Sequence, residues 1–573
     1  MILRALLRTA ALPVILGTAL ACGSAPAAPA AAIDSDLLDV SVAQLHRFYA
    51  DKKYTVTQVV QWHLDRIDRY NGVYGAIETV FRDAALAEAR RQDAGAAVGN
   101  HGPLWGVPIV IKANTSIKGQ VTSAGWEGFT KKGHELIAPQ DATIVAKFKA
   151  AGAIIVGHSN MPDLANSDTN RSSSFGRTGN AYDVRFSPGG SSGGTVTAVA
   201  ANMAVLGNGT DTGNSIRMPA ATSALVGVYP TRGLVSIAGI APLDWLLDNT
   251  GPIARNAADA GIALAVMAGE DPLDPRTAEA RTSKQLGPYD AFLKADALTG
   301  QRFGVPAFVL AGEGVPFHGI PARVPEAAAE KSRVGAAMAL RPETREMFVK
   351  AVAALRAAGA EVVDDDGILP AAFARMASRV STYAYMLDGT NQFLSRFGPA
   401  EYRSAADYLK AVGTPLFTSS IGTEDFFANI GGVRVEQKPL DTDPEAGRNY
   451  HEPRRAMLAA YLETMDRLKL DGYVYPAIQM PPPDETMAQD GALSGGPHSN
   501  TSWINMIGVP AVVVPAGFYA SGLPFGLEFA ARPWTDGDLL AVAYAWERAT
   551  KLRKPPTLVE KGLLPITPAK SAR

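Results

Sequence analysis

The sequence of 573 residues contains one cysteine, Cys22, so neither an intramolecular disulfide nor a cysteine-ligated metal site can form. It also lacks an excess of either charge, because 54 Lys and Arg residues against 56 Asp and Glu residues give a formal net charge of −2. Proteins that bind nucleic acid through their charge have a clear basic excess. The balance therefore argues against a nucleic-acid partner.

Motifs that hold metals or phosphate groups are also missing. The His-Glu pairs at 134–135 and 451–452 are not followed by a second histidine at helical spacing, as a zinc helix requires. No lysine follows a glycine-rich loop in the way that a phosphate-binding loop requires. We therefore expect no metal and no cofactor.

The apolar segment 10–21 is too short for an ordinary membrane span. Arg4 and Arg8 precede it, and residues 19–24 read ALACGS, which together resemble a secretory signal with a small-residue cleavage site. We expect export to the periplasm or beyond, either as a free protein or as a lipoprotein anchored by lipidation of Cys22. That anchor is the only membrane contact we expect. An N-terminal helix of the fold is the alternative.

This interpretation divides the chain into a signal peptide at 1–21, an Ala/Pro-rich spacer at 22–36, one large domain at 37–560 and a tail at 561–573. Hydrophobic periodicity in the large domain alternates between helices and strands, which predicts an α/β sheet covered on both faces. Helices are expected at 42–70 (with Thr55 as a cap), 84–93, 142–151, 343–358 and 536–548. Strands are expected at 107–112, 153–157, 301–306, 361–363, 472–476 and 511–515. Residues 310–340, rich in Ala, Gly and Pro, are expected to form an exposed insertion.

Two serine- and glycine-rich loops follow a single lysine. Residues 187–194 read SPGGSSGG, residues 207–217 read GNGTDTGNSIR, and Lys112 ends the apolar run at 107–112. Residues 195–206 between the loops are almost wholly apolar or small, which predicts a buried helix and strand rather than a mobile linker. A serine hydroxyl needs a base to become a nucleophile, and backbone N–H groups in such loops can stabilise an oxyanion.

These residues resemble the amidase signature family of serine hydrolases. Ser215 follows Ser191 by 24 positions, the spacing of the two catalytic serines in that family. The resemblance extends to DNTGPIAR at 248–255, NMIGVPA at 505–511 and GLPFG at 522–526. It covers residues 37–551, is weakest at 310–481, where the family varies most, and implies one large mixed β-sheet with helices on both faces.

The resemblance also implies roles. Ser215 matches the nucleophile that becomes an acyl ester, Ser191 the bridging serine held by a cis peptide bond, and Lys112 the base. The backbone N–H groups of Thr212, Gly213, Asn214 and Ser215 match the oxyanion hole. A lysine is protonated at neutral pH, so we expect burial to lower the pKa of Lys112 until its neutral form can accept a proton.

Two positions depart from the family pattern. Many members have Gly where this chain has Asn214, and Asp where it has Asn114. Neither change removes a catalytic group, but Asn214 narrows the conformations of its loop and can reach the substrate. Asp211 and Arg217, which flank this loop, are expected to form an ion pair that shapes it, with a direct role in substrate binding as the alternative.

Residues 190–194 also match the Gly-x-Ser-x-Gly elbow of α/β-hydrolases, with Ser192 as nucleophile and His318, His451 or His498 as its partner. That elbow needs a strand directly before it, whereas residues 185–189 predict a turn. Residues 207–213 resemble a dinucleotide loop only in having glycines, because the spacing differs and no acidic residue lies about 20 positions on.

We therefore expect hydrolysis of a small carboxamide or aryl amide through a Ser215 acyl-enzyme, with protons relayed by Ser191 and Lys112. An amidotransferase-type glutaminase subunit of the same family is the first alternative. The predicted export argues against it, since tRNA charging is cytoplasmic. A protein that binds amides without turnover is the second alternative.

Overall fold

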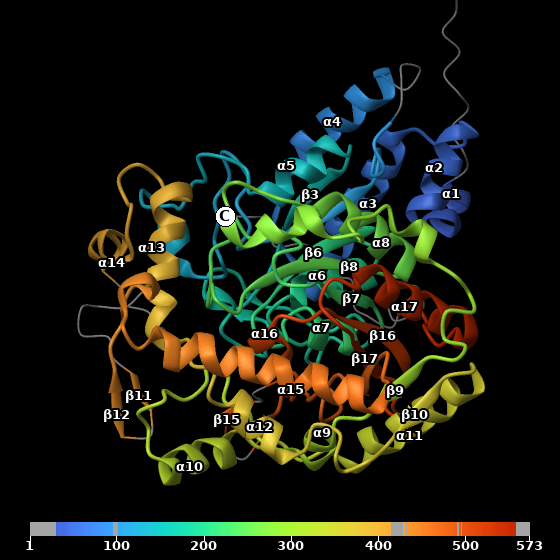
Figure 1. The fold of residues 1–573 in the computed structure, drawn as a ribbon. Coiled ribbons are helices and arrows are strands. Elements are labelled where there is room, and N and C mark those ends of the chain that lie inside the picture. Colours follow the sequence, from blue (N-terminus) through green and yellow to red (C-terminus); the bar gives the residue numbers. More distant parts are fainter. Residues whose placement is uncertain are drawn as a thin grey trace, which may run out of the picture. The chain divides into compact units, whose positions relative to one another are not determined.

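The computed structural model describes residues 30–95, 101–413, 428–430, 432–489, 492–493 and 496–556 (Figure 1). The chain divides into two compact units, Met1–Leu38 and Asp39–Arg573. In the first unit the structure describes helix α1, Ala30–Leu37. The predicted signal segment and Cys22 lie outside the described residues. All other described elements belong to the second unit.

The helices near its start form where the periodicity predicts them. The expected segment 42–70 is split into α2 (Val42–Ala50) and α3 (Val56–Tyr74). Thr55 caps α3, because its side chain accepts a hydrogen bond from the backbone N–H of Gln58 while the Gln58 side chain accepts one from the N–H of Thr55. Such a reciprocal pair satisfies two amide groups that a helix start leaves without partners.

The described residues build one sheet of 11 strands, in which parallel and antiparallel pairs are mixed. Strand β2 lies between β3 and β6 and is parallel to both. From β6 onward, each neighbouring pair in the order β6, β8, β7, β16, β17, β13 is antiparallel. The strands in spatial order are β1 Ile77–Val80, β3 Ile154–Ser159, β2 Pro108–Lys112, β6 Leu206–Asp211, β8 Asn249–Ala254, β7 Val226–Tyr229, β16 Ala511–Phe518, β17 Pro524–Ala530, β13 Gly472–Pro476, β9 Arg302–Gly304 and β10 Glu361–Val363.

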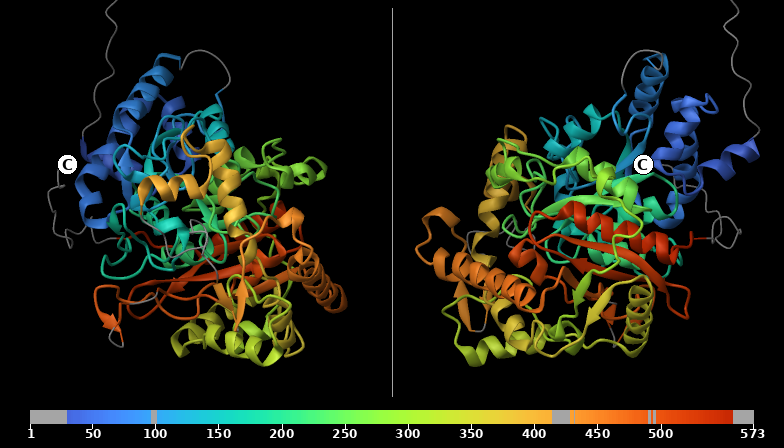
Figure 2. Two further views of the ribbon diagram at one scale, coloured as in Figure 1. Left: turned by 90° about the vertical axis from the view of Figure 1, so that its left-hand side faces the viewer. Right: turned by 45° about the vertical axis from the view of Figure 1, so that its right-hand side comes forward.

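Helices cover both faces of this sheet, as predicted. On one face, Val513 of β16 packs in a buried cluster with residues of α3, α4 (Arg82–Gly95), α6 (Gly193–Ala200) and α7 (Arg217–Thr222). On the other face, Phe529 of β17, which pairs with Val512, contacts Trp546 of α17 (Asp536–Thr550). Figure 2 shows α17, in red, beside the C-terminal strands. Side chains of successive strand residues point to opposite faces, so each strand supplies both layers.

The remaining elements surround this core. The helices are α5 Thr143–Ala150, α8 Ala257–Met267, α9 Ala307–Ala311, α10 Glu326–Ala336, α11 Pro342–Ala357, α12 Ala371–Ala377, α13 Met386–Phe397, α14 Ala405–Val412, α15 Glu452–Leu468 and α16 Trp503–Ile507. Three two-stranded pairs join β4 Arg171–Ser172 to β5 Gly176–Arg177, β11 Ala428–Ile430 to β12 Val433–Val435, and β14 Ala488–Gln489 to β15 Ala492–Leu493.

The prediction of an exposed insertion at 310–340 is wrong for part of that segment. Ile320, Val324 and Ala329 are buried and form a small apolar cluster of their own. Val315 is buried as well, in the larger cluster that contains α12 and α15. Apolar side chains at irregular spacing gave no periodic signal here, so the burial was not visible in the sequence. The exposed part includes Val334 on α10.

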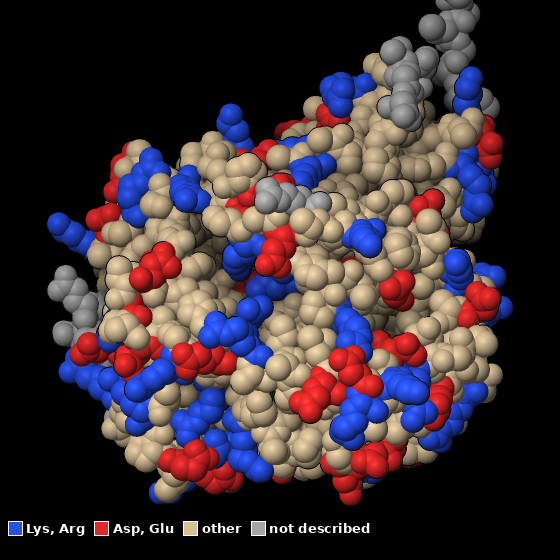
Figure 3. All heavy atoms as spheres, in the orientation of Figure 1, with Lys and Arg blue, Asp and Glu red and all other residues tan. Residues whose placement is uncertain are grey.

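Charged side chains are interspersed on the face shown in Figure 3, where Lys and Arg lie among Asp and Glu. Exposed ion pairs of the protein include Lys350 with Glu346 and Arg448 with Glu445. Exposed pairs of this kind contribute about 0–1 kcal/mol each. This face therefore matches the nearly balanced charge of the sequence.

Candidate active site

The three polar residues singled out in the sequence meet at one edge of the sheet. Lys112 ends β2, and the loop with Ser215 begins where the neighbouring parallel strand β6 ends. Because parallel strands present their carboxyl ends at the same edge, the two residues are brought together there. Ser191 arrives from the loop that leads into α6.

Lys112 is fully buried and its ammonium nitrogen is surrounded by hydroxyl groups. Its Nζ lies 2.7 Å from Ser191 Oγ, 2.9 Å from Ser192 Oγ and 2.8 Å from Thr210 Oγ1. Burial lowers the pKa of Lys112 to about 7, although the charges of Asp211 and Asp248 act in the opposite direction. A substantial neutral fraction at physiological pH follows, which is what a general base needs.

Asn114, one of the two departures from the family pattern, lies next to this lysine. Its Nδ2 donates to Thr210 Oγ1 at 3.2 Å, and Thr210 is itself a Lys112 partner. An aspartate at this position would place a third negative charge near Lys112 and raise the lysine pKa. The neutral amide therefore favours the unprotonated lysine.

The loop before α6 holds both Ser191 and Ser192 in the buried interior. The Gly190–Ser191 peptide bond is cis. Gly190 has no room for a side chain, since an added Cβ would lie 2.3 Å from the carbonyl oxygen of Ser167. Ser192 Oγ contacts Lys112 and the carbonyl oxygen of Thr210.

The elbow arrangement with Ser192 as nucleophile is not present among the described residues. No strand directly precedes Ser192, and none of the three candidate histidines is hydrogen-bonded to it. His318 is bonded instead to Asp244, with Nδ1 3.0 Å from Oδ2. Among the described residues, the Ser192 hydroxyl is therefore hydrogen-bonded to Lys112 and to no histidine.

Ser215 lines a cavity of about 380 Å³ beside the loop. Its Oγ donates to Asn214 Oδ1 at 3.4 Å, and no hydrogen bond from Ser215 Oγ to Ser191 Oγ is formed among the described residues. Hydrogen bonds of catalytic groups are often long in unliganded proteins and tighten with substrate.

The backbone donors beside Ser215 are not used elsewhere. Within the described part of the chain, the N–H groups of Gly213, Asn214 and Ser215 donate to no protein acceptor, whereas that of Ile216 donates to Asp211. Thr212 is held by its side chain, which donates to Asp248 Oδ1 at 2.6 Å. Free N–H groups aligned in one loop are available to a developing oxyanion.

Arg217 fixes the shape of this loop, and the expected ion pair is confirmed. Its guanidinium is fully buried, donates from Nε to Asp211 Oδ2 at 3.0 Å and from Nη1 to Glu528 Oε1 at 2.8 Å. It also donates to the carbonyl oxygen of Gly213 at 3.1 Å and to Asn505 Oδ1 at 2.5 Å. The guanidinium does not line the cavity beside Ser215, so its role is to hold the loop.

Several residues of the site carried no sequence signal. Thr210 was missed because a threonine inside a strand is ordinary. Asp168, Phe317, Ser499 and Ser502 line the cavity from three segments that are distant in sequence. Phe317 packs against the loop before Ser215 so closely that a Cβ added to Gly213 would lie 2.1 Å from its ring. Only the fold brings these segments to Ser215.

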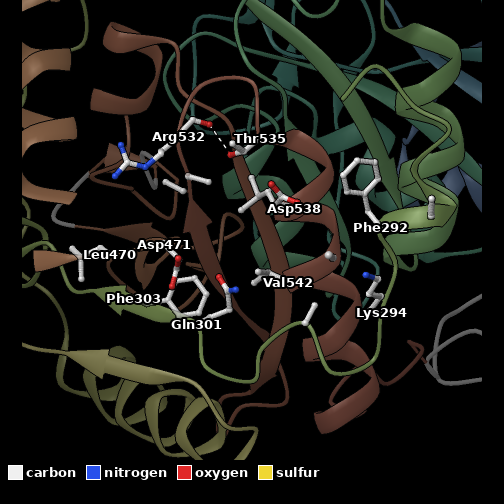
Figure 4. Close-up of a pocket in the computed structure, with 16 residues that line it drawn as sticks. Phe292, Lys294, Gln301, Phe303, Leu470, Asp471, Arg532, Thr535, Asp538 and Val542 are labelled. Atoms are coloured by element: carbon white, nitrogen blue, oxygen red, sulfur yellow. Dashed lines mark hydrogen bonds between the residues drawn. The ribbon is translucent and has the colours of Figure 1, made fainter. Parts of the chain in front are cut away.

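A larger cavity of about 580 Å³ lies elsewhere, between α17, the residues just before β13 and the segment that leads into β9. Figure 4 shows its polar lining, which includes Lys294, Asp471, Arg532 and Asp538. Size alone does not make it the active site, because it has no serine, cysteine or histidine among its lining residues. No group of three or more His, Cys, Asp or Glu residues in the described ranges is arranged to hold a metal ion.

A large mixed sheet with a buried lysine–serine pair at the carboxyl edge of its parallel strands defines a serine amidase, an enzyme that acts on the C–N bond of amides. The chain belongs to the amidase signature family. The family model described as Amidase matches residues 58–313 and 327–540.

The curated relatives are similar over nearly the whole chain. A glutamyl-tRNA(Gln) amidotransferase subunit from Symbiobacterium thermophilum is 31% identical over 535 residues, which cover 91% of this chain and 99% of the relative. The protein of the same name from Alkaliphilus metalliredigens is 30% identical and covers 89% of this chain and 96% of its own length.

Solved structures agree with the fold. A peptide amidase in complex with chymostatin is 28% identical, with a TM-score of 0.72 over 90% of this chain and 99% of that chain. The native peptide amidase from Stenotrophomonas maltophilia is also 28% identical, with a TM-score of 0.70 over 90% of this chain and 98% of its own.

The prediction of export is wrong. The relatives that match nine-tenths of the chain are subunits of a tRNA-linked amidotransferase, and tRNA charging is cytoplasmic. The pattern behind the prediction was local, resting on two arginines, a short apolar run and Cys22, all of which lie outside the described residues. No helix in the described ranges has the length and apolar character needed to cross a membrane. Export therefore no longer counts against an amidotransferase role.

We expect Lys112→Met to change how stability depends on pH. The pKa of Lys112 is about 7 in the folded chain and about 10.5 in the unfolded chain, so between these values unfolding takes up a proton and wild-type stability falls as pH falls. The variant lacks this dependence. Its stability relative to wild type should rise from pH 10 to pH 7 and level off below pH 7 in chemical denaturation curves. A constant difference across this range would contradict a lowered lysine pKa.

Arg217→Met should be severely destabilising, because it leaves two buried carboxylates without their cation. Removal of one partner from a buried pair typically costs about 3–5 kcal/mol. The stability of the Arg217→Lys protein should lie between that of Arg217→Met and that of wild type, because an ammonium group keeps the charge but cannot make the paired hydrogen bonds of a planar guanidinium. The control is Arg82→Met, which breaks an exposed pair with Asp68. Equal unfolding midpoints for the Arg217→Met and Arg82→Met proteins would refute the role given to Arg217.

Proposed function

We propose that this protein cleaves a carboxamide through an acyl-enzyme on Ser215, with Lys112 as the base and Ser191 as the bridge between them. The observation that carries the proposal is the 2.7 Å contact between a fully buried Lys112 Nζ and Ser191 Oγ, beside a loop of free backbone N–H groups. A lysine with a pKa of about 7 can accept a proton at neutral pH.

The steps follow from these positions. Neutral Lys112 takes the proton of Ser191, Ser191 takes the proton of Ser215, and Ser215 Oγ forms a bond to the carbonyl carbon. The N–H groups of Thr212, Gly213, Asn214 and Ser215 stabilise the oxyanion, and removal of one such donor typically costs about 3–4 kcal/mol of barrier. Lys112 returns its proton through Ser191 to the leaving nitrogen as the C–N bond breaks. Water then hydrolyses the ester.

Two settings share this chemistry. In a free-standing amidase the acyl group passes to water and ammonia is the by-product. In a glutaminase subunit, ammonia from a carboxamide is passed on by an amidotransferase, and the partners then include other subunits as well as the small amide. The names of the curated relatives support the second setting more directly than the first. The peptide amidase structures support the first.

Substrate preference distinguishes the settings. We expect the purified chain to release ammonia from L-glutamine with a higher kcat/KM than aniline from an acyl anilide, because the cavity beside Ser215 is only about 380 Å³ and has polar walls. Ammonia and aniline are quantified in parallel on glutamine, a peptide carboxamide and an anilide, with Ser215→Ala as the blank. A preference for peptide carboxamides would favour the free-standing amidase. A preference for the anilide would contradict a primary-amide substrate.

The two serines should respond differently to a fluorophosphonate probe. Ser215→Ala should lose both labelling and turnover, whereas Ser191→Ala should lose most turnover but keep slow labelling, since its nucleophile remains. Ser192→Ala is the matched control, because it removes a Lys112 contact outside the proposed relay. Mass spectrometry of the labelled peptides identifies the modified residue. Labelling of Ser191 or Ser192 in the Ser215→Ala protein would overturn the assignment.

We also propose that the amidase domain spans residues 37–560, with 561–573 as a tail. The two segments that the family model matches, residues 58–313 and 327–540, lie within these limits.

A further inference from the structure

The cavity beside Ser215 has one ionisable side chain among the described residues that line it, and this is Asp168. The other described lining residues, which include Asn214 and Ser215, carry no ionisable carboxylate, amine, guanidinium or imidazole. A negative charge in a partly enclosed space repels anionic substrate groups and attracts cationic ones. Among the described lining residues, Asp168 is therefore the one that can present a charge directly to a ligand in the cavity.

Asp168 is connected to the nucleophile by two hydrogen bonds. Asn214 Nδ2 donates to Asp168 Oδ1 at 3.0 Å, and Asn214 Oδ1 accepts from Ser215 Oγ at 3.4 Å. The carboxylate thus lies one amide side chain away from the reacting oxygen. A substrate group that meets Asp168 is separated by only a few bonds from the carbonyl that Ser215 attacks.

Among the described residues, the Asp168 carboxylate has fewer hydrogen-bond and ionic partners than it can accept. No ion pair to Lys, Arg or His reaches Asp168 within the described ranges, and its Oδ2 has no hydrogen-bond partner there. Burial raises the pKa of Asp168, against the hydrogen bond from Asn214 and the charge of His498. A cation brought by a ligand would supply the missing partner through a charge-assisted hydrogen bond.

The backbone around Asp168 is held in place from both sides. The carbonyl oxygens of Ser167 and Thr169 lie against Gly190, where a Cβ would approach them to 2.3 and 2.7 Å. Gly496 is packed against the backbone of Asp168, since its Cβ would lie 2.7 Å from the Asp168 carbonyl carbon. A side chain on such a fixed backbone can select among ligands.

We propose that Asp168 determines specificity by binding a protonated amine of the substrate, so that the preferred substrates are carboxamides that carry an ammonium group a few bonds from the amide carbonyl. This rests on the proposed function of Ser215. Asn214 takes part by orienting the carboxylate, which gives its side chain a role in substrate choice.

The first experiment measures binding rather than turnover. In the Ser215→Ala protein, isothermal titration compares 4-aminobutanamide, whose amine and amide are spaced as in glutamine, with its N-acetyl derivative, which has no charge. We expect about tenfold tighter binding of the charged amide, the usual effect of one charge-assisted hydrogen bond. Equal affinities would overturn the proposal whether or not Ser215 is the nucleophile.

The second experiment changes the carboxylate. Asp168→Asn should reduce kcat/KM for 4-aminobutanamide by about tenfold to hundredfold and leave that of the N-acetyl derivative within about threefold. Asp183→Asn is the control, because Asp183 pairs with Arg185 outside the cavity. Equal losses on both substrates would show that Asp168 only positions Asn214. If wild type turns over neither amide while the titration still discriminates between them, the proposed reaction fails and the binding role stands.

Discussion

The fully buried guanidinium of Arg217 is the interaction on which the rest of the site depends. It joins Asp211 at the end of β6 to Glu528 in β17 and Asn505 in α16, two C-terminal elements that are far from β6 in sequence. Desolvating this many charges is costly, and the cost is offset only where the geometry is good and every proton has an acceptor. The same guanidinium binds the carbonyl of Gly213, so the loop that presents Ser215 is fixed to the C-terminal strands of the sheet.

Burial has opposite consequences for the two cations of the site. Arg217 remains charged because two carboxylates contact it, whereas Lys112 is surrounded by neutral hydroxyls and its pKa is lowered to about 7. Asp211 and Asp248 act on Lys112 only through space and do not restore its ordinary pKa. The difference between the pKa values of these two cations therefore comes from which atoms touch each nitrogen, not from depth in the protein.

Much of this could be predicted from the sequence. A continuous apolar run located β2, helical periodicity located α3 and α17, and the loop around Ser215 indicated both the family and the ion pair at Arg217. The cavity wall could not be predicted in this way. Asp168 and Phe317 reach Ser215 from segments without periodicity, and their neighbours are set by long-range packing. The prediction of export failed for a different reason, because a pattern in a short N-terminal segment was used to assign the location of the whole protein.

The contact between Phe317 and Gly213 limits how this enzyme can be altered. Gly213 lies within the first segment that the family model matches, whereas Phe317 lies in the gap between the two matched segments, and the two residues touch without space for a methyl group. Replacing residues 310–320 with the corresponding loop of a relative would therefore move the Phe317 ring that contacts Gly213. In chimaeras between relatives, the segment that carries Phe317 and the loop that carries Gly213 should accordingly be taken from the same parent.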